Sequence, residues 1–550
     1  MAAVTPEQRE RAPETPEAPP PGESAPRARG LAGVARGGAL NLTGAGYSAI
    51  AGFAVTALVA RGLGPHEAGM FFTATTLFVI AAVVIKLGAP TGLVYWLARL
   101  RALGQHRLLR RCLRAALAPV LIASGVVGAA IYLTAPWLAR LAPGAAGAGD
   151  DGFAAQLRIL AVALPLAAIT ETLLAATRGH RIMRATVLVD KLGRPTLQLI
   201  GLAAAVAFAA SNNWYTFAWG APWALAAVTA WLWLRSVLPR RPDPDQPGLP
   251  DMTNHHPAGS LSPELDRLGR QFWAFTWPRG AANVLQLMLQ RSDILLVAGM
   301  LGFTAAAGYA AATRFVVVGQ LGSAAISAAV EPRLAESLAR DDHAAAKTFY
   351  QGATGWLVLI MWPVYLLTAL FAPYYLKLFG SAYATPEAIA VVMLLCGAML
   401  LTSSCGMVDV MLAMTGPTTW NLANVSIAVA LNLGLNLLLI GKLGIVGAAV
   451  AWTAAIALKN LLPLAQLARR GLHPYGRGTV TAAALAMACF GVLPTAAGAV
   501  FGWGLPVLAT AVAVGTVCYL TGLWRLRDPL NLTALHSMRA SARPIVMEMP

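Results

Sequence analysis

One apolar segment of the sequence, residues 271–300, carries five polar side chains that could bind a ligand together. They are Arg279, Asn283, Gln286, Gln290 and Asp293. Their spacing of 4, 3, 4 and 3 residues places all five on one face of a helix. Guanidinium groups bind phosphate oxygens well, and neutral amides suit sugar hydroxyls. The stripe therefore favours a pyrophosphate-bearing or otherwise anionic saccharide as ligand.

The next apolar segment, residues 304–329, carries a second polar stripe. It consists of Thr313, Gln320, Ser323 and Ser327, with Arg314 beside it. Counted from the turn near Gly302, Asp293 and Arg314 lie at similar depth in a helical hairpin. We expect them to form an ion pair, with Arg291 as the alternative partner of Asp293. Whether such a pair contacts substrate or only neutralises its own charges stays open at this level.

Two further charged residues lie inside apolar segments of the first half. Lys86 shares a helical face with Thr76, and Glu171 lies in the inner part of residues 153–176. We expect Lys86 to line the same cavity, with Glu171 and Asp293 as candidates for ion coupling. In the second half, Asn421, Asn432 and Asn436 share one face, a pattern more typical of helix packing than of a binding site.

The sequence contains no catalytic signature and no set of metal ligands. A GxSxG elbow, a Walker GxxxxGK[ST] loop and an HExxH motif are missing, so we expect neither an enzyme nor an ATP-driven pump. The five cysteines form no CxxC pair, so we expect them to be small buried residues. They are Cys112, Cys396, Cys405, Cys489 and Cys518. His255 and His256 have no further ligands nearby. No metal or cofactor is expected.

Composition indicates that lipid is the solvent for much of the chain. The 550 residues are 57% hydrophobic and only 12% charged, whereas a soluble domain has about 25% charged residues. The net charge of +17 comes from arginines in short segments between apolar runs. That distribution is typical of cytoplasmic loops, and no nucleic-acid-binding module accompanies it. We therefore expect a membrane protein without a nucleic-acid partner.

The predicted fold is an all-α polytopic membrane protein with about fourteen transmembrane helices, since a span needs about 20 apolar residues. The spans are 38–60, 68–90, 112–135, 153–176, 185–209, 215–237, 271–300, 304–329, 348–372, 386–410, 418–440, 443–467, 479–500 and 503–524. Basic residues concentrate in the even-numbered connections, which places these loops and both termini in the cytoplasm of a plasma or inner membrane.

A short internal repeat suggests two pseudo-symmetric lobes of six helices each. LVARGLGPHEAGMF (58–71) resembles LVAGMLGFTAAAGY (296–309) with one inserted residue, at the first turn of each half. Transporters commonly place their site between such repeats. The predicted divisions are a disordered cytoplasmic tail (1–35), an N-lobe (36–238), a cytoplasmic linker (239–263), a C-lobe (264–470), two further spans (471–525) and a cytoplasmic tail (526–550).

Several motifs together resemble the polysaccharide flippases of the multidrug/oligosaccharidyl-lipid/polysaccharide (MOP) exporter superfamily. The motifs are LGPHEAGMF (63–71), LQRSDILLVAGMLG (289–302), VEPRLAE (330–336), LFGSAY (378–383) and NLLLIGKLGIVGAAVAWTAA (436–455). The resemblance covers about residues 36–525. It implies two lobes arranged as a V, alternating access, a central cavity and a polyprenyl-(pyro)phosphate-linked saccharide as substrate, with glycosyltransferases or a polymerase of the same pathway as partners.

Three functions were weighed. The first is a flippase for lipid-linked oligosaccharide or polysaccharide intermediates, of the polysaccharide (O-antigen) type; the lipid II branch relies on arginines in the first span, which this chain lacks after Arg36. The second is an ion-coupled multidrug or metabolite exporter of the MATE type, which Glu171 favours. The third, a membrane glycosyltransferase or polymerase, requires a large extracytoplasmic loop, and all odd-numbered loops here are short.

Overall fold

The computed structural model describes residues 24–140, 150–237, 261–416, 418–528 and 530. Throughout these residues the regular structure is helical, with no strand. The predicted all-α membrane fold is therefore confirmed. The histidine pair of the predicted linker lies outside the described residues, as do residues 1–23 of the predicted tail. Helix α1 begins at Ser24, within the range that was expected to be disordered.

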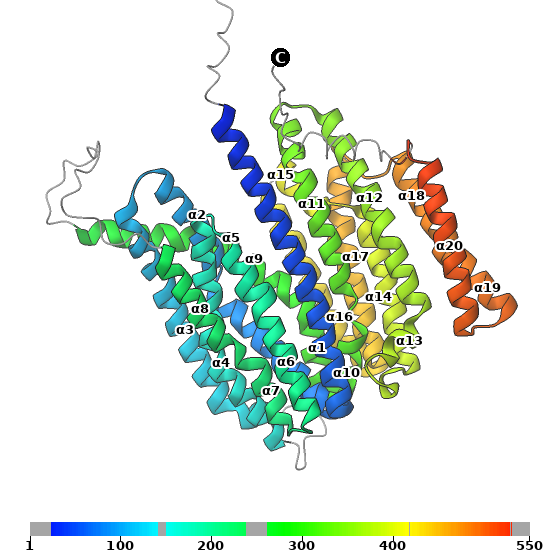
Figure 1. Ribbon diagram of the computed structural model, residues 1–550, viewed down its shortest axis with the longest axis horizontal. Helices are drawn as coiled ribbons and strands as arrows, with labels where there is room; N and C mark the ends of the chain where they lie inside the picture. Colours follow the sequence, from blue (N-terminus) through cyan, green and yellow to red (C-terminus); the bar gives the residue numbers. More distant parts are fainter. Residues whose placement is uncertain (1–23, 141–149, 238–260, 417, 529, 531–550) are drawn as a thin grey trace, which may run out of the picture.

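The first half of the chain forms one group of helices, seen on the left of Figure 1. These are α1 (Ser24–Lys86), α2 (Ala89–Ala102), α3 (His106–Arg140), α4 (Asp150–Gly179), α5 (Met183–Thr186), the π-helix η2 (Val187–Gly193), α6 (Arg194–Ala207), α7 (Asn212–Gly220) and α8 (Pro222–Val237). Helix α1 runs between this group and the next, so it contributes to both sides of the molecule's centre.

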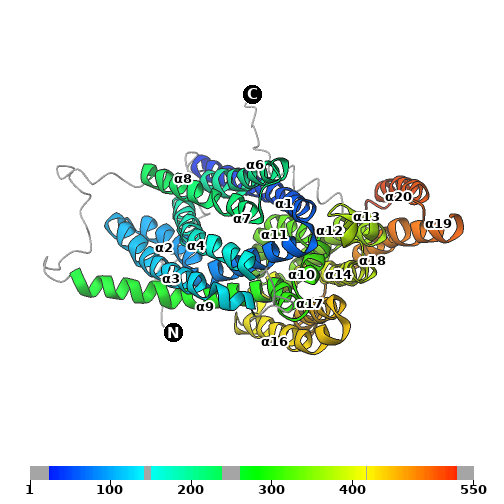
Figure 2. The ribbon, with the colours of Figure 1, turned by 90° about the horizontal axis from the view of Figure 1, so that it is seen from below.

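The second half forms the other group. It contains α9 (Leu261–Leu301), α10 (Phe303–Ala312), α11 (Val316–Ala339), α12 (His343–Leu370), α13 (Ala372–Lys377), η3 (Ser381–Tyr383), α14 (Pro386–Cys405), α15 (Val408–Thr415), α16 (Thr418–Leu443) and α17 (Ile445–Ala468). The last elements are α18 (Arg477–Ala486), the π-helix η4 (Met487–Val492), α19 (Leu493–Phe501) and α20 (Leu505–Arg525). Figures 1 and 2 place them at one end of the molecule, beside α12.

In the part of the chain that the structure describes, eleven helical stretches are long and apolar enough to cross a membrane. One of them, Leu40–Ala102, contains both of the first two predicted spans. The predicted spans 185–209 and 304–329 are helical but interrupted, and neither is among the eleven. The chain is thus a multi-pass membrane protein, and the number fourteen stays a prediction.

The interruptions have local causes. Each π-helix ends two residues before a proline, Pro195 after η2 and Pro494 after η4. A proline ring clashes with the carbonyl four residues earlier and supplies no N–H, and widening the helix by one residue relieves the clash. Between α10 and α11, Thr313–Phe315 form a turn instead of a continuous helix.

The two copies of the sequence repeat adopt matching backbone conformations. Gly64 has φ 76° and ψ 171°, and Gly302, at the corresponding position, has φ 90° and ψ 176°. This left-handed region is accessible to glycine at little cost. Both glycines lie where one long helix bends into the next. The repeated motif therefore encodes the same joint in both halves.

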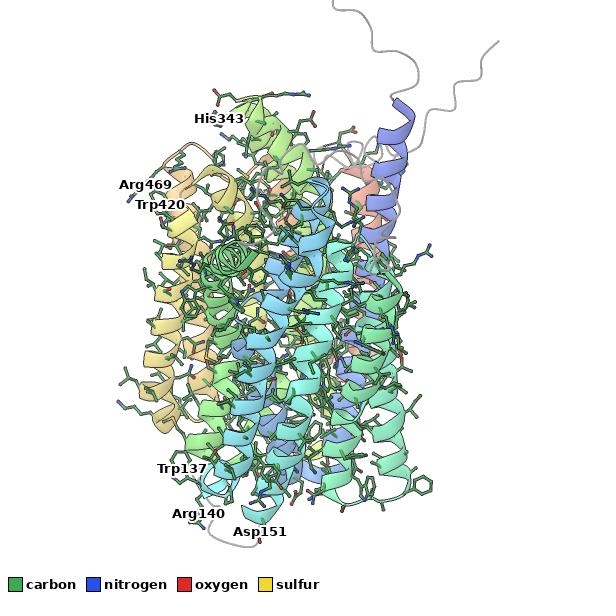
Figure 3. All side chains as sticks on the ribbon, turned by 90° about the vertical axis from the view of Figure 1, so that its left-hand side faces the viewer. Trp137, Arg140, Asp151, His343, Trp420 and Arg469 are labelled. Carbon is green, nitrogen blue, oxygen red and sulfur yellow. The ribbon has the colours of Figure 1, made fainter. Side chains whose placement is uncertain are left out.

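The ends of the bundle differ in character. Figure 3 places Trp137, Arg140 and Asp151 at one end, and His343, Trp420 and Arg469 at the other. The even-numbered connections marked by His343 and Arg469 thus lie at the end opposite Arg140 and Asp151, which flank an odd-numbered connection, as the charge pattern predicts. Its assignment to the cytoplasm stays a prediction.

The two halves of the chain touch at the end of the bundle opposite His343 and again at its centre. Arg61 Nε donates to the Leu378 carbonyl at 2.8 Å, and Tyr383 Oη donates to the Ala60 carbonyl at 3.4 Å. At the centre, the joint between α1 and α2 crosses α9 so closely that a Cβ on Gly280 would lie 2.3 Å from the Leu87 carbonyl. Only glycine permits this crossing, which brings α9 next to α1 and α2.

Candidate functional site

A polar pocket of about 320 Å³ lies beside this crossing, and five of the predicted site residues line it. They are Lys86, Glu171, Asn283, Gln286 and Gln290, and the remaining wall is Val83, Gly88, Pro90, Thr91 and Leu287. The residues come from α1, α4, α9 and the start of α2. We call this space the amide pocket. Segments far apart in sequence thus converge on it, as the sequence analysis expected of the α9 stripe and Lys86, and Glu171, predicted as a candidate for ion coupling, joins them.

An ion pair forms one wall of the amide pocket. Lys86 Nζ donates to Glu171 Oε2. The Lys86 side chain is 7% exposed and that of Glu171 is 36% exposed. A buried charge in a membrane protein requires a partner or water, and here Lys86 has both a carboxylate and a polar pocket. Glu171 is therefore the more accessible partner, and Lys86 is the charge that it neutralises.

The α9 stripe reaches the pocket along the predicted face. Asn283 and Gln290 are exposed and Gln286 is half-buried. One turn earlier, Arg279 is exposed, donates to the Phe275 carbonyl at 2.8 Å, and lies 3.7 Å from the centre of the Phe275 ring. Arg279 thus lies next to the pocket on its predicted cytoplasmic side rather than in its wall.

The last residue of the stripe, Asp293, does not reach the amide pocket. It is 2% exposed, accepting hydrogen bonds from Tyr309 Oη at 3.0 Å and Asn436 Nδ2 at 2.9 Å. Asn436 also donates to the side chain of Asn432. The asparagine face of α16, expected to serve packing, therefore surrounds a carboxylate.

The expected ion pair between Asp293 and Arg314 is wrong. Among the described residues, Asp293 forms no ion pair, with Arg314 or with Arg291. Because α10 ends at Ala312, the turn that follows directs Arg314 toward α1, where its guanidinium lies 5.9 Å from the Phe72 ring centre. Arg314 Nε is buried without a hydrogen-bond partner. The side chain of Gln320 lies outside the described part, and Arg314 does not line the amide pocket.

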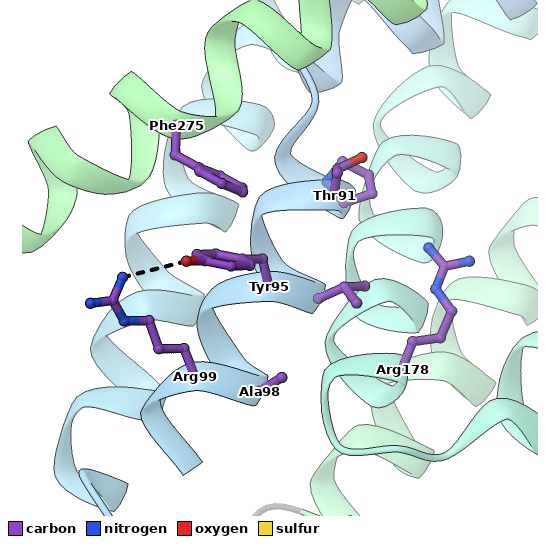
Figure 4. A pocket seen from close by; sticks show the side chains of 8 residues that line it. Thr91, Tyr95, Ala98, Arg99, Arg178 and Phe275 are labelled. Carbon is purple, nitrogen blue, oxygen red and sulfur yellow. Dashed lines mark hydrogen bonds between the residues drawn. The ribbon is translucent and has the colours of Figure 1, made fainter. Parts of the chain in front are cut away.

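A second pocket of about 680 Å³ adjoins the first and was missed by the sequence analysis (Figure 4). Its lining consists of Pro90, Thr91, Val94, Tyr95, Ala98, Arg99, Arg178 and Phe275. Pro90 and Thr91 also line the amide pocket. Arg99 and Arg178 lie in connections that the sequence analysis assigned to the cytoplasm, and Tyr95 and Phe275 were not among its candidate residues. The i, i+4 spacing of Thr91, Tyr95 and Arg99 was the available signal.

An ion pair in the second half was also missed. Lys459 Nζ on α17 donates to Asp409 Oδ2 on α15 at 2.7 Å. The Lys459 side chain is 11% exposed and that of Asp409 is 41% exposed. As in the amide pocket, a sheltered lysine is neutralised by a more accessible carboxylate. A lysine within the apolar run 443–467 was the signal that could have indicated it.

The described residues contain no group of three or more histidines, cysteines or acidic residues that could hold a metal ion. The five cysteines are free and four of them are buried. In this part of the chain, the polar groups that converge are a lysine, a carboxylate and amides. This set can bind an anion and hydroxyl groups.

Comparison with known proteins shows the family. Residues 34–338 match the model of the family described as polysaccharide biosynthesis protein, and residues 278–438 match that of the MatE family. No curated protein matches the chain significantly.

Two solved structures resemble the fold. One is the lipid II flippase MurJ in an inward closed conformation, with a TM-score of 0.64 and 11% identity, covering 88% of this chain and 98% of that one. The other is a multidrug resistance MATE family transporter of the MOP superfamily in its inward-facing conformation, with a TM-score of 0.57 and 14% identity, covering 77% of this chain and 95% of that one.

The matched family model covers more than half of the chain, so the resemblance found in the sequence motifs is confirmed. The family and the structural neighbours are transporters and flippases rather than enzymes. The chain belongs to the polysaccharide biosynthesis protein family, a family of membrane flippases and exporters within the MOP superfamily.

Proposed function

We propose that this protein moves a polyprenyl-(pyro)phosphate-linked saccharide across the plasma or inner membrane by alternating access between its two lobes, residues 36–238 and 264–470. The observation that carries the proposal is the amide pocket, which collects one lysine, one carboxylate and three amides at a crossing between the two halves. Such a pocket offers a cation to phosphate and amide groups to sugar hydroxyls. Both termini are placed in the cytoplasm, as the basic even-numbered loops favour.

The ion pair gives the pocket a means of regulating affinity. Glu171 neutralises Lys86. A phosphate that enters must compete with the carboxylate, so the anion binds less tightly than an unpaired buried lysine would hold it. A transporter needs this moderation, because a substrate held too tightly is not released.

We further propose that Asp293 couples transport to an ion gradient. Its carboxylate is buried against Tyr309 and Asn436, and the Asn436 Oδ1 and Asn432 Nδ2 atoms have no hydrogen-bond partner. A buried carboxylate among unsatisfied amides is suited to bind and release H⁺ or Na⁺. This feature also favours the second candidate, an ion-coupled exporter of drugs or metabolites, in which Glu171 would be a second coupling group.

The test measures movement of a fluorescent prenyl-pyrophosphoryl disaccharide between leaflets in proteoliposomes. Arg279→Ala should lower the rate of transfer about tenfold or more, because a lost hydrogen bond to a charged group costs about 1.5–3 kcal/mol. Gln286→Ala should lower the rate severalfold, because a lost hydrogen bond to a neutral sugar hydroxyl costs about 0.5–1.5 kcal/mol. Lys442→Ala, at an exposed site on α16, is the matched control and should transfer at the wild-type rate. Proton- or sodium-driven efflux of cationic drugs, with no transfer of the disaccharide lipid, would favour the exporter instead.

A further inference from the structure

The larger pocket beside the amide pocket differs from it in chemistry. Its wall carries two arginines and an aromatic pair, and no carboxylate. Among the described residues neither Arg99 nor Arg178 forms an ion pair. Arg99 donates only a long hydrogen bond of 3.4 Å to Tyr95 Oη, and its guanidinium also lies over the Trp96 ring. Asp190 and Glu171 act on Arg178 only at longer range than an ion pair, so both guanidinium groups can still bind an anionic ligand.

The aromatic pair offers a flat surface between these cations. Tyr95 and Phe275 stack with ring centres 4.3 Å apart and planes 17° apart. Tyr95 remains 43% exposed and lines the pocket. Figure 4 shows its ring between Arg99 and Arg178, with Phe275 above it. The face of an aromatic ring is electron-rich and packs well against the C–H groups of a sugar ring. The wall thus combines phosphate-binding and sugar-binding groups.

The two pockets lie next to each other, and both are lined by residues of α2, α4 and α9. Glu171 and Arg178 are seven residues apart on α4, which is two turns and about 10 Å. Thr91 and Arg99 are eight residues apart on α2, about 12 Å. Pro90 and Thr91 line both pockets, so the two pockets are neighbours.

We propose that Tyr95, Arg99, Arg178 and Phe275 form a first-contact subsite for the headgroup of the lipid-linked saccharide. The arginines bind its pyrophosphate and the Tyr95 ring packs against its first sugar, before the headgroup moves to the amide pocket. The subsite lies nearer the end where the even-numbered loops gather, the end predicted to be cytoplasmic. This assignment rests on the proposed transport function for the identity of the ligand and on the pocket for the chemistry of binding.

Binding to the full-length protein in phosphatidylcholine nanodiscs tests the subsite. The probe is fluorescent farnesyl-pyrophosphoryl-N-acetylglucosamine, compared with farnesyl pyrophosphate, which lacks the sugar. Arg178→Gln and Arg99→Gln should each weaken both probes about tenfold. Tyr95→Ala should weaken only the sugar-bearing probe, and Tyr95→Phe should leave both unchanged. Arg101→Gln is the matched control, because Arg101 lies on the same helix but outside the pocket.

The outcomes separate this proposal from the transport function. Wild-type binding by both arginine variants overturns the subsite, even if transfer between leaflets continues. Displacement of the probe by phosphatidylglycerol at equal affinity also overturns it, because the pocket would then hold an ordinary lipid headgroup. Arginine-dependent binding in a protein that transfers no saccharide lipid supports the subsite and contradicts the transport proposal.

Discussion

The pairing of Lys86 with Glu171 predicts that removing the acid strengthens substrate binding and slows transport. Glu171→Gln leaves a nearly buried lysine facing a polar pocket without its counter-ion. A hydrogen bond to a charged group contributes about 1.5–3 kcal/mol. Because the Glu171 side chain is 36% exposed, water screens part of the competition, and we take the lower half of that range. The affinity for a pyrophosphate probe should then rise about tenfold, since 1.4 kcal/mol corresponds to a factor of ten.

Lys86→Gln should have the opposite effect. It leaves the carboxylate facing the pocket, so the same probe should bind at least about tenfold more weakly. The double variant, Lys86→Gln with Glu171→Gln, removes both charges and should bind with intermediate affinity. The difference between the double variant and the sum of the single variants measures the coupling of the two side chains.

The assay combines probe binding in nanodiscs with transfer rates in proteoliposomes. Glu171→Gln should show a lower Kd together with a lower maximal rate, because tighter ground-state binding raises the barrier to release. Thermal unfolding of each variant reports whether the unpaired charge destabilises the fold. If Glu171→Gln folds normally and binds the probe more weakly than the wild type, the competition between carboxylate and phosphate does not exist and the reasoning is refuted.

Three further predictions follow from contacts between helices. Arg61→Ala removes the 2.8 Å hydrogen bond to the Leu378 carbonyl. Cysteines introduced beside this contact should then react faster with thiol-reactive probes, because the two halves separate there more readily. Unchanged reactivity would show that the hydrogen bond does not hold the halves together. Gly280→Val forces apart the crossing of α9 with Leu87, so it should lower the free energy of unfolding by about 1–3 kcal/mol and abolish transfer. Gly299→Ala is the control, because no neighbour lies within 4 Å of that position, and it should change neither stability nor transfer. Asp293→Asn keeps hydrogen bonding to Asn436 but should remove dependence of transfer on H⁺ or Na⁺ gradients, and retained ion dependence would place coupling elsewhere.

Part of the site could be predicted because a helix has a fixed period. Asn283, Gln286 and Gln290 follow that period within one segment, and they line one pocket as expected. Lys86 and Glu171 were identified individually, because charge is costly inside a membrane. Their pairing joins residues 85 positions apart, and no local pattern of the sequence indicates which distant helices meet.

The same limit explains the errors and omissions. Asp293 lies on the predicted face, but a packed neighbour covers that end of the stripe, so Asn436 and Tyr309 satisfy it instead of Arg314. Depth counted along an ideal hairpin placed Arg314 beside Asp293, whereas the turn after Ala312 redirects the side chain. The subsite around Tyr95 was missed because an aromatic residue in an apolar run is ordinarily core.

The sequence by itself determined the membrane environment, the helical class, the family and the repeated glycine joint at Gly64 and Gly302, because hydropathy, period and backbone permissiveness are local properties. Tertiary structure alone decided which charges neutralise each other and which polar groups share a cavity. Helix crossings such as that of Gly280 with Leu87 set those neighbours, and a crossing depends on the packing of whole helices rather than on any one segment.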